Sequence, residues 1–174
     1  ELADRAWAER NEQVPPMRSV EEALDEVAAG QWKKLGPVSL VDVDDIVGAG
    51  APGGNTHFVQ TLVRNNRGLN VLVPLHDPAA VEAAWHQPDG ATISLVLRGT
   101  PGYGQPEVPI TARILSRCDA EHGRTLLLRI DSFHLAISQR PPLPIHPSFW
   151  TNLGASPRTA DAIVQKNFFH YRMF

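Results

Sequence analysis

The sequence predicts a mixed α/β fold in a single, three-layer-like domain, and two periodic patterns along its 174 residues carry this prediction. In the first half, apolar runs typical of strands alternate with helical patterns, and the order strand–helix–strand–helix is typical of a parallel α/β unit. In the second half, apolar residues recur at every second position, which indicates antiparallel strands joined by short turns.

The composition excludes several classes of protein. With 43% hydrophobic and 20% charged residues, the chain is typical of a globular protein, and a net charge of −3 argues against nucleic-acid binding. A single cysteine excludes a disulfide scaffold and fits a reducing compartment. No apolar run approaches the roughly 18 residues of a membrane helix. We therefore expect a cytoplasmic protein that binds neither membrane nor nucleic acid.

Residues 1–35 are expected to form a helical lead-in to an α/β domain over residues 36–174. Alanine and tryptophan spacing near the start predicts one short amphipathic helix. Ser19 and Glu22 form a capping box, so a second helix begins there, and Gly30 ends it.

The α/β domain is expected to begin with two strand–helix pairs. Asp77 and Pro78 are a strong helix start, with the aspartate as N-cap and the proline in the first turn. The predicted elements are a strand over 37–43, a glycine-rich loop over 48–54, a helix from Asn55 or Thr56, a strand over 69–73 and a helix from Asp77.

The second half should contain an antiparallel meander between Thr92 and Ser138, followed by a helix that ends at Gly154 and a short strand over 162–164. The expected core-facing residues are Ile93, Leu95, Leu97, Val108, Ile110, Ala112, Ile114, Leu126, Leu128, Ile130, Phe133, Leu135 and Ile137.

The glycine-rich loop matches the dinucleotide-binding pattern G-x-G-x-x-G over residues 48–53. Pro52 inside the turn, three nearby aspartates and the cap role of Asp77 all argue against an NAD site. Two interpretations stay open. Free backbone N–H groups at the following helix start favour an anion or carboxylate ligand, whereas a tight turn would need the glycines for its backbone alone.

Three aspartates lie at the end of the first predicted strand, and they could hold a hard cation, act as acid and base, or form a solvated strand end. Strand alternation predicts that Asp42 and Asp44 point one way and Asp45 the other.

The seven histidines show no spacing typical of a zinc site. Lys166, His170 and Arg172 cluster near the end of the sequence. Cys118 lies in a strand without a spaced partner and is expected to be inert.

Four segments, in order along the chain, together resemble one family. Residues 42–56, DVDDIVGAGAPGGNT, are similar to the pattern D-x-x-D-N-P-G-G-G-A-P-G-D-x-T of the C-terminal domain of MlrC-like proteins, the microcystinase C family of metallopeptidases. The other matches are D-P-x-A-V at 77–81, G-x-G-x-x-x-x-L at 90–97 and K-S-x-x-H-F-R at 166–172.

This resemblance implies a two-part protein. Family members carry the metal ligands and the catalytic acid and base in a larger N-terminal part, so we expect zinc in the full-length parent and no metal or catalytic residue in this chain. Both ends look truncated relative to the family. The implied partners are that N-terminal metal-binding domain and a peptide or small-molecule substrate, with a possible homo-oligomer.

The resulting hypothesis is the C-terminal domain of an MlrC-like zinc-dependent amide or peptide hydrolase, which alone is inactive and supplies a substrate-facing loop. Ile46 and Gly54 replace two polar residues of the family pattern. Lys166 or Arg172 would hold a substrate carboxylate and His170 a developing oxyanion. The expected substrate-binding residues are Asp45, Gly50, Gly53, Gly54, Asn55, Thr56, Lys166, His170 and Arg172.

The alternative is a non-catalytic module that binds a small anion or buttresses a partner domain. The two hypotheses differ in what surrounds the loop. A substrate-facing loop predicts a solvent-reachable concavity at residues 48–56 with Lys166 or His170 nearby. A purely structural loop predicts that Asn55 or Thr56 caps its own helix and that the glycines pack against protein.

Overall fold

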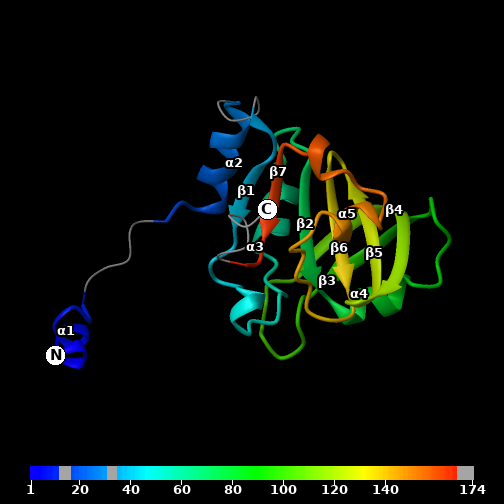
Figure 1. Ribbon diagram of the computed structural model, residues 1–174. Coiled ribbons are helices and arrows are strands. Elements are labelled where there is room, and N and C mark those ends of the chain that lie inside the picture. Colours follow the sequence, from blue (N-terminus) through cyan, green and yellow to red (C-terminus); the bar gives the residue numbers. More distant parts are fainter. Residues whose placement is uncertain (12–16, 31–34, 168–174) are drawn as a thin grey trace.

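The computed structural model describes residues 1–11, 17–30 and 35–167, and these form a mixed α/β domain around one seven-stranded sheet (Figure 1). The helices are α1 (Leu2–Ala8), α2 (Val20–Ala28), α3 (His57–Arg64), α4 (Pro78–Ala84) and α5 (Ser148–Thr151). The strands are β1 (Val38–Val41), β2 (Val71–His76), β3 (Thr92–Leu97), β4 (Val108–Ala120), β5 (Gly123–Ile130), β6 (Phe133–Ser138) and β7 (Ala162–Gln165).

The strand order is β1-β7-β2-β6-β5-β4-β3. The first four strands in this order run parallel, and the pairs β6–β5, β5–β4 and β4–β3 are antiparallel. The predicted mixed fold is therefore confirmed, including the antiparallel part between Thr92 and Ser138. The last strand, β7, lies between β1 and β2, so the two halves of the chain share one sheet.

Two helix starts form as their sequence signals predict. Ser19 and Glu22 exchange both bonds of the capping box at the start of α2. The Asp77 carboxylate accepts a 2.9 Å hydrogen bond from the Ala80 N–H, with Pro78 in the first turn of α4. Each cap satisfies backbone donors that the helix itself leaves unpaired.

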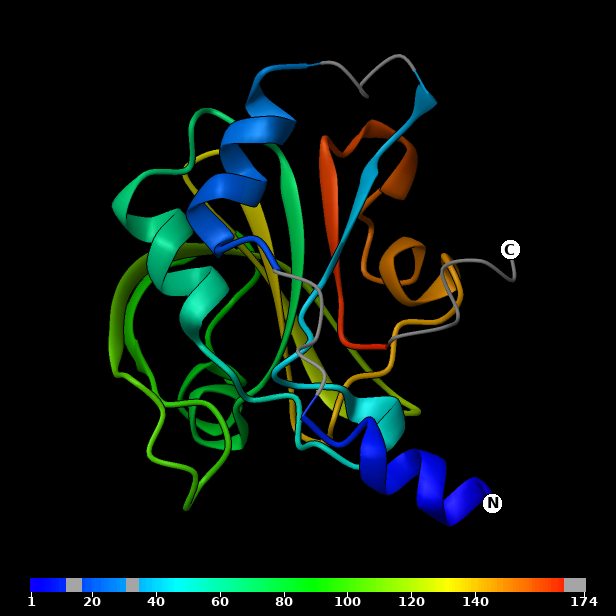
Figure 2. The same cartoon turned by 90° about the vertical axis from the view of Figure 1, so that its left-hand side faces the viewer.

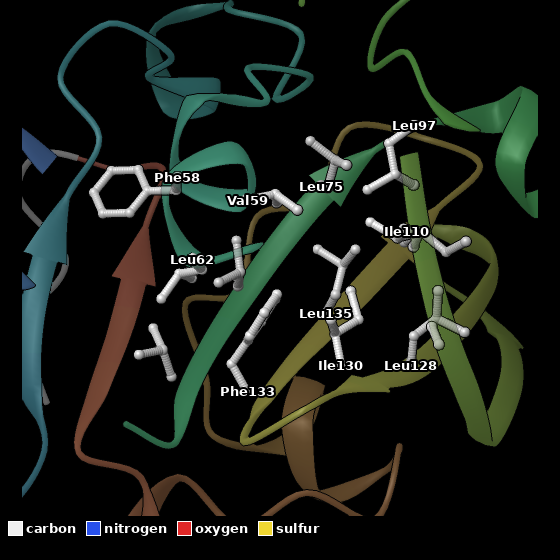
Figure 3. Close-up of a cluster of buried hydrophobic side chains, with 14 of the residues drawn as sticks. Phe58, Val59, Leu62, Leu75, Leu97, Ile110, Leu128, Ile130, Phe133 and Leu135 are labelled. Carbon is white, nitrogen blue, oxygen red and sulfur yellow. The ribbon is translucent and has the colours of Figure 1, made fainter. Parts of the chain in front are cut away.

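One face of the sheet packs against α2, α3 and α4. Figure 3 shows Phe58, Val59 and Leu62 of α3 lying above side chains of the strands. Leu24 and Val27 of the lead-in helix α2 belong to the same core, whereas α1 buries no residue. Every strand residue that alternation placed in the core is in this cluster or packs against it. Full burial of each large side chain contributes roughly 1.5–3 kcal/mol.

The opposite face is covered by α5, which gives the three layers that the sequence predicts. Trp150 and Leu153 pack against Leu72, Leu127 and Ala136 of the sheet. Seen from the side in Figure 2, α2 and α3 lie on one side of the strands and α5 on the other. None of the helices in the described ranges is long and apolar enough to cross a membrane.

A β-bulge interrupts the pairing of β4 with β5. The register passes from Ile114–Leu128 to Ser116–Leu127, so Leu115 has no partner. A bulge moves the following residues to the other face of a sheet. Ser116 accordingly donates a hydrogen bond to the Leu153 carbonyl beside α5, and Cys118 packs against the core on that same face.

Candidate functional site

Three charged side chains are buried together at the carboxyl ends of two neighbouring strands. Asp42 directly follows β1 and Lys166 directly follows β7, and the parallel register of these strands brings the two residues together. The Lys166 ammonium donates 2.8 Å hydrogen bonds to Oδ2 of Asp42 and to Oδ2 of Asp45. The three side chains are 1%, 6% and 4% exposed, so water contributes little to their solvation. We call these residues the buried triad.

Asp45 connects the triad to the glycine-rich loop. Its Oδ1 accepts a hydrogen bond from the Gly53 N–H, and its Oδ2 accepts one from the Asn55 N–H, both at 2.8 Å. Hydrogen bonds to a buried carboxylate are stronger than those between neutral groups. One side chain therefore fixes the loop across eight to ten residues of sequence.

The prediction that Asp45 points away from Asp42 is wrong. Strand alternation does not apply, because β1 ends at Val41 and a turn follows, in which the Asp45 N–H donates to the Asp42 carbonyl. The turn brings Asp42 and Asp45 to the same ammonium and leaves Asp44 exposed. Sequence reasoning thus missed Asp42 as a partner of Lys166, although a D-x-x-D spacing is compatible with such a turn.

Three glycines of the loop lie against other parts of the protein. A Cβ atom on Gly54 would stand 2.1 Å from Thr100 Oγ1, and one on Gly53 would stand 2.9 Å from both Pro142 and Val47. On Gly48 it would meet the Asn167 side chain at 2.7 Å. Close packing of this kind is the structural role that the sequence left open for these glycines.

Gly50 differs from the other loop glycines. Its φ of +98° favours glycine, and a Cβ atom there would meet nothing within 4 Å. It ends the short 3-10 helix η2 (Val47–Ala49), and residues 48–50 are all exposed. This segment is the part of the loop that is open to solvent.

The start of α3 is held by groups of the loop itself. The Asn55 side-chain oxygen accepts a 2.9 Å hydrogen bond from the His57 N–H, and the Thr56 hydroxyl donates to the Pro106 carbonyl at 2.8 Å. Both residues are buried. Asn55 therefore satisfies one of the donors that an anionic ligand would otherwise meet.

A second set of contacts ties the loop to β2 and to residues 98–106. The Gly53 carbonyl accepts from the His76 N–H at 2.9 Å, and the His76 ring is hydrogen-bonded to the Thr100 hydroxyl at 2.8 Å. Burial lowers the pKa of His76 below its ordinary value, although the Gln139 carbonyl and the charges of Asp77 and Asp45 oppose this shift. The His76 ring is thus part of the framework under the loop.

Asp77 uses both carboxylate oxygens inside the protein. Oδ1 caps α4, and Oδ2 accepts hydrogen bonds from the N–H groups of Arg98 and Gly99 at 2.7 and 2.9 Å. The side chain is fully buried. It is not placed to bind a ribose hydroxyl, which agrees with the sequence-based argument against an NAD site.

A cavity of about 390 Å³ between α2 and β1 reaches the same corner of the molecule. Asp42 and Asp44 line it together with apolar residues such as Val20 and Phe58. Arg18 lines it as well, and the Asp42 carboxylate is paired with Lys166, so the charges of the lining favour neither an anionic nor a cationic ligand.

The structure joins four of the nine predicted substrate-binding residues, Asp45, Gly53, Asn55 and Lys166, by hydrogen bonds. Two more, Gly54 and Thr56, lie in the same loop and contact Thr100 and Pro106. Gly50 lies at the exposed tip of the same loop, and His170 and Arg172 lie outside the described residues. Lys166 holds Asp42 and Asp45, which precede the loop. The contact of all nine with a substrate stays a prediction.

The described residues contain no group of three or more His, Cys, Asp or Glu side chains arranged to hold a metal ion. The arrangement instead presents an exposed backbone segment, residues 48–50, on a rigid and buried support.

Comparison with known proteins places the chain in a family. Residues 40–173 match the family described as MlrC C-terminus, and the chain therefore belongs to this family. Among solved structures, it is similar to a crystal structure described as a "putative metallopeptidase" from Mesorhizobium sp. BNC1, with a TM-score of 0.87 and 23% sequence identity. The similarity covers 99% of this chain and 37% of the Mesorhizobium chain, so the fold described here corresponds to about a third of that protein. A search of curated proteins found no match.

Proposed function

We propose that this chain is the C-terminal domain of a zinc-dependent amide or peptide hydrolase, and that residues 48–50 form part of the substrate site. The observation that carries the proposal is the buried triad, because it fixes an exposed backbone segment at the carboxyl ends of parallel strands. Ligand sites of open α/β sheets lie at this edge. Membership of the MlrC C-terminus family and the description of the Mesorhizobium protein support the reaction class.

Zinc is proposed to bind outside this chain, in an N-terminal metal-binding domain of the same protein. The proposal assigns no catalytic step to the described residues. Their proposed part is positional. The triad and the Asp45 hydrogen bonds hold the loop backbone in one conformation. Because the loop is already ordered, less entropy is lost when it orients a substrate. His170 and Arg172 are proposed to contact the substrate directly, in a cytoplasmic enzyme.

The test adds bulk to the exposed part of the loop in the longer protein that carries this domain. Ala49 is exposed on η2, and Ala49→Trp should reduce kcat/KM for a peptide substrate by about tenfold or more, since small misplacements of a substrate are costly. Ala83→Trp is the matched control, because Ala83 is exposed on α4. Unchanged turnover in a folded Ala49→Trp variant would exclude a substrate-facing loop.

A zinc titration of the chain alone tests the second half of the proposal. The isolated chain should bind zinc only weakly and hydrolyse no peptide. Stoichiometric zinc with sub-micromolar affinity would contradict the placement of the metal in another domain.

The packing of Gly48, Gly53 and Gly54 favours a second candidate, a non-catalytic domain that buttresses its partner. In that case Ala49→Trp would leave kcat/KM unchanged and lower the melting temperature of the longer protein. The same pair of measurements therefore separates the two candidates.

A further inference from the structure

A pocket of about 150 Å³ lies on the face of the sheet that α5 covers. It is bounded by the end of the β4–β5 hairpin, by residues 143–146 and by α5. It shares no lining residue with the glycine-rich loop or the triad. The pocket is therefore separate from the site of the proposed function.

The β-bulge at Leu115 creates the floor of this pocket. Without it, Cys118 would share the face of Ile110, Ala112 and Ile114 and point into the main core. With it, Cys118 and its cross-strand partner Thr125 face α5. Together with Ala120, these are small side chains, and they leave room above the sheet.

Two aromatic rings form one wall. The His122 ring lies edge-on to Phe149, with centroids 5.4 Å apart and planes at 64°, and Phe149 packs in the same manner on Trp150 at 4.9 Å. The helix that carries Phe149 is only four residues long, whereas β4 has 13 residues. The helix therefore leaves the end of the hairpin uncovered.

The size and lining of the pocket indicate its ligand. A protein cavity of about 150 Å³ is large enough for benzene. Here Leu143, Ile145 and Phe149 form the apolar part of the lining, and polar residues, His146 among them, form the rest. Aromatic rings also prefer the edge-to-face contacts that Phe149 and His122 already make. The outer rim is polar, with exposed Glu121, Ser148 and Asn152.

We propose that this pocket binds a monocyclic aromatic ring with one polar substituent, the ring lying over Cys118 and Thr125 beside Phe149 and the substituent reaching the rim. The ring can belong to a free small molecule or to a tyrosine side chain, and the two sources share the same chemistry.

Cys118 makes the proposal testable, because it is the only cysteine of the chain and lines the pocket. Burial raises the pKa of its thiol, and Asp119 adds to this, so alkylation by N-ethylmaleimide is followed at one fixed pH. A saturating concentration of p-cresol should slow alkylation by at least about fivefold, as expected when the free fraction falls to about a fifth. No change in rate would overturn the proposal.

N-acetyl-L-tyrosinamide is the second probe. Protection by both compounds supports a site that also admits a tyrosine side chain, and protection by p-cresol alone supports a free small aromatic ligand. Protection by the amide alone overturns the proposal, because a ring that enters the pocket does not need the peptide groups.

Two variants locate the binding site in the folded chain. Ala120→Phe fills the pocket and should abolish p-cresol binding in ligand-observed NMR, whereas Asp119→Phe, the adjacent exposed residue that does not line the pocket, should leave binding intact. Far-UV circular dichroism checks that both variants fold. Binding that survives Ala120→Phe, or that Asp119→Phe also removes, would place the ligand elsewhere and contradict the proposal.

Discussion

Replacement of Lys166 by methionine should be among the most destabilising single changes in the domain. Methionine preserves much of the side-chain volume but removes the ammonium, so Asp42 and Asp45 remain as two buried carboxylates. Their Oδ2 atoms are at most twice 2.8 Å apart, because each lies 2.8 Å from the same nitrogen. At this separation two like charges repel by about 3 kcal/mol at an effective dielectric constant of about 20.

The lost attraction adds to this repulsion, and removal of one partner from a buried ion pair costs roughly 3–5 kcal/mol. For a domain of this size, 1 kcal/mol corresponds to about 2–4 °C, so the melting temperature should fall by roughly 6–20 °C. Urea denaturation followed by circular dichroism measures the free energy of unfolding directly.

Arg98→Met is the matched control. The Arg98 side chain forms an ion pair with Glu107 at 3.0 Å, but both side chains are more than half exposed. This variant should therefore lower the free energy of unfolding by at most about 1 kcal/mol. The double variant Lys166→Met with Asp42→Asn should be more stable than Lys166→Met alone, since it removes one of the two carboxylates that repel each other. If Lys166→Met cost no more than Arg98→Met, the triad would not be what holds the loop.

Three further predictions concern a buried carboxylate, a closely packed glycine and two histidines. Asp77→Ala should lower the free energy of unfolding by about 3 kcal/mol or more, measured in urea, because it removes a helix cap and leaves two buried donors, of Arg98 and Gly99, without an acceptor. Gly54→Ala should lower the free energy of unfolding by about 1–3 kcal/mol and perturb the NMR signals of Thr100, because the Thr100 backbone nitrogen would lie 2.3 Å from the new Cβ atom. If the variant had the melting temperature of the wild type, the protein would relieve this contact at little cost. Burial lowers the pKa of His76 and His134 below 6.5, so the unfolded chain binds more protons than the folded chain as the pH falls below this value. The free energy of unfolding should therefore be highest above pH 6.5 and should decrease at lower pH, by up to about 1.4 kcal/mol per pH unit for each histidine. The double variant His76→Gln with His134→Gln should flatten this pH dependence.

Local signals in the sequence predicted most of the individual elements. The capping box at Ser19, the Asp77–Pro78 helix start and the alternation from Ile93 to Ile137 each depend on a few neighbouring residues, and all three are confirmed. These helix starts and strands could be predicted because each is determined mainly by contacts between residues that are close in the sequence.

The features that the sequence could not predict depend on distant pairs. The contact of Lys166 with Asp42 spans 124 residues and exists only because β7 pairs with β1. The sequence places Cys118 in a strand, as the structure does, but the bulge at Leu115 that turns it toward α5 has no signal in the alternation pattern. A one-residue irregularity is enough to change the face of every residue that follows it.

The position of β7 also determines when the domain can be completed during synthesis. Neither β1 nor β2 pairs with the other, and β7 provides the hydrogen bonds that join them. Until residues 162–166 have left the ribosome, β1 lacks its sheet partner, and the Lys166 ammonium cannot reach Asp42 and Asp45. A nascent chain without these residues therefore carries β1 as an unpaired strand. Partly folded chains with open strand edges aggregate readily, so the unfinished domain is most prone to aggregation before β7 emerges.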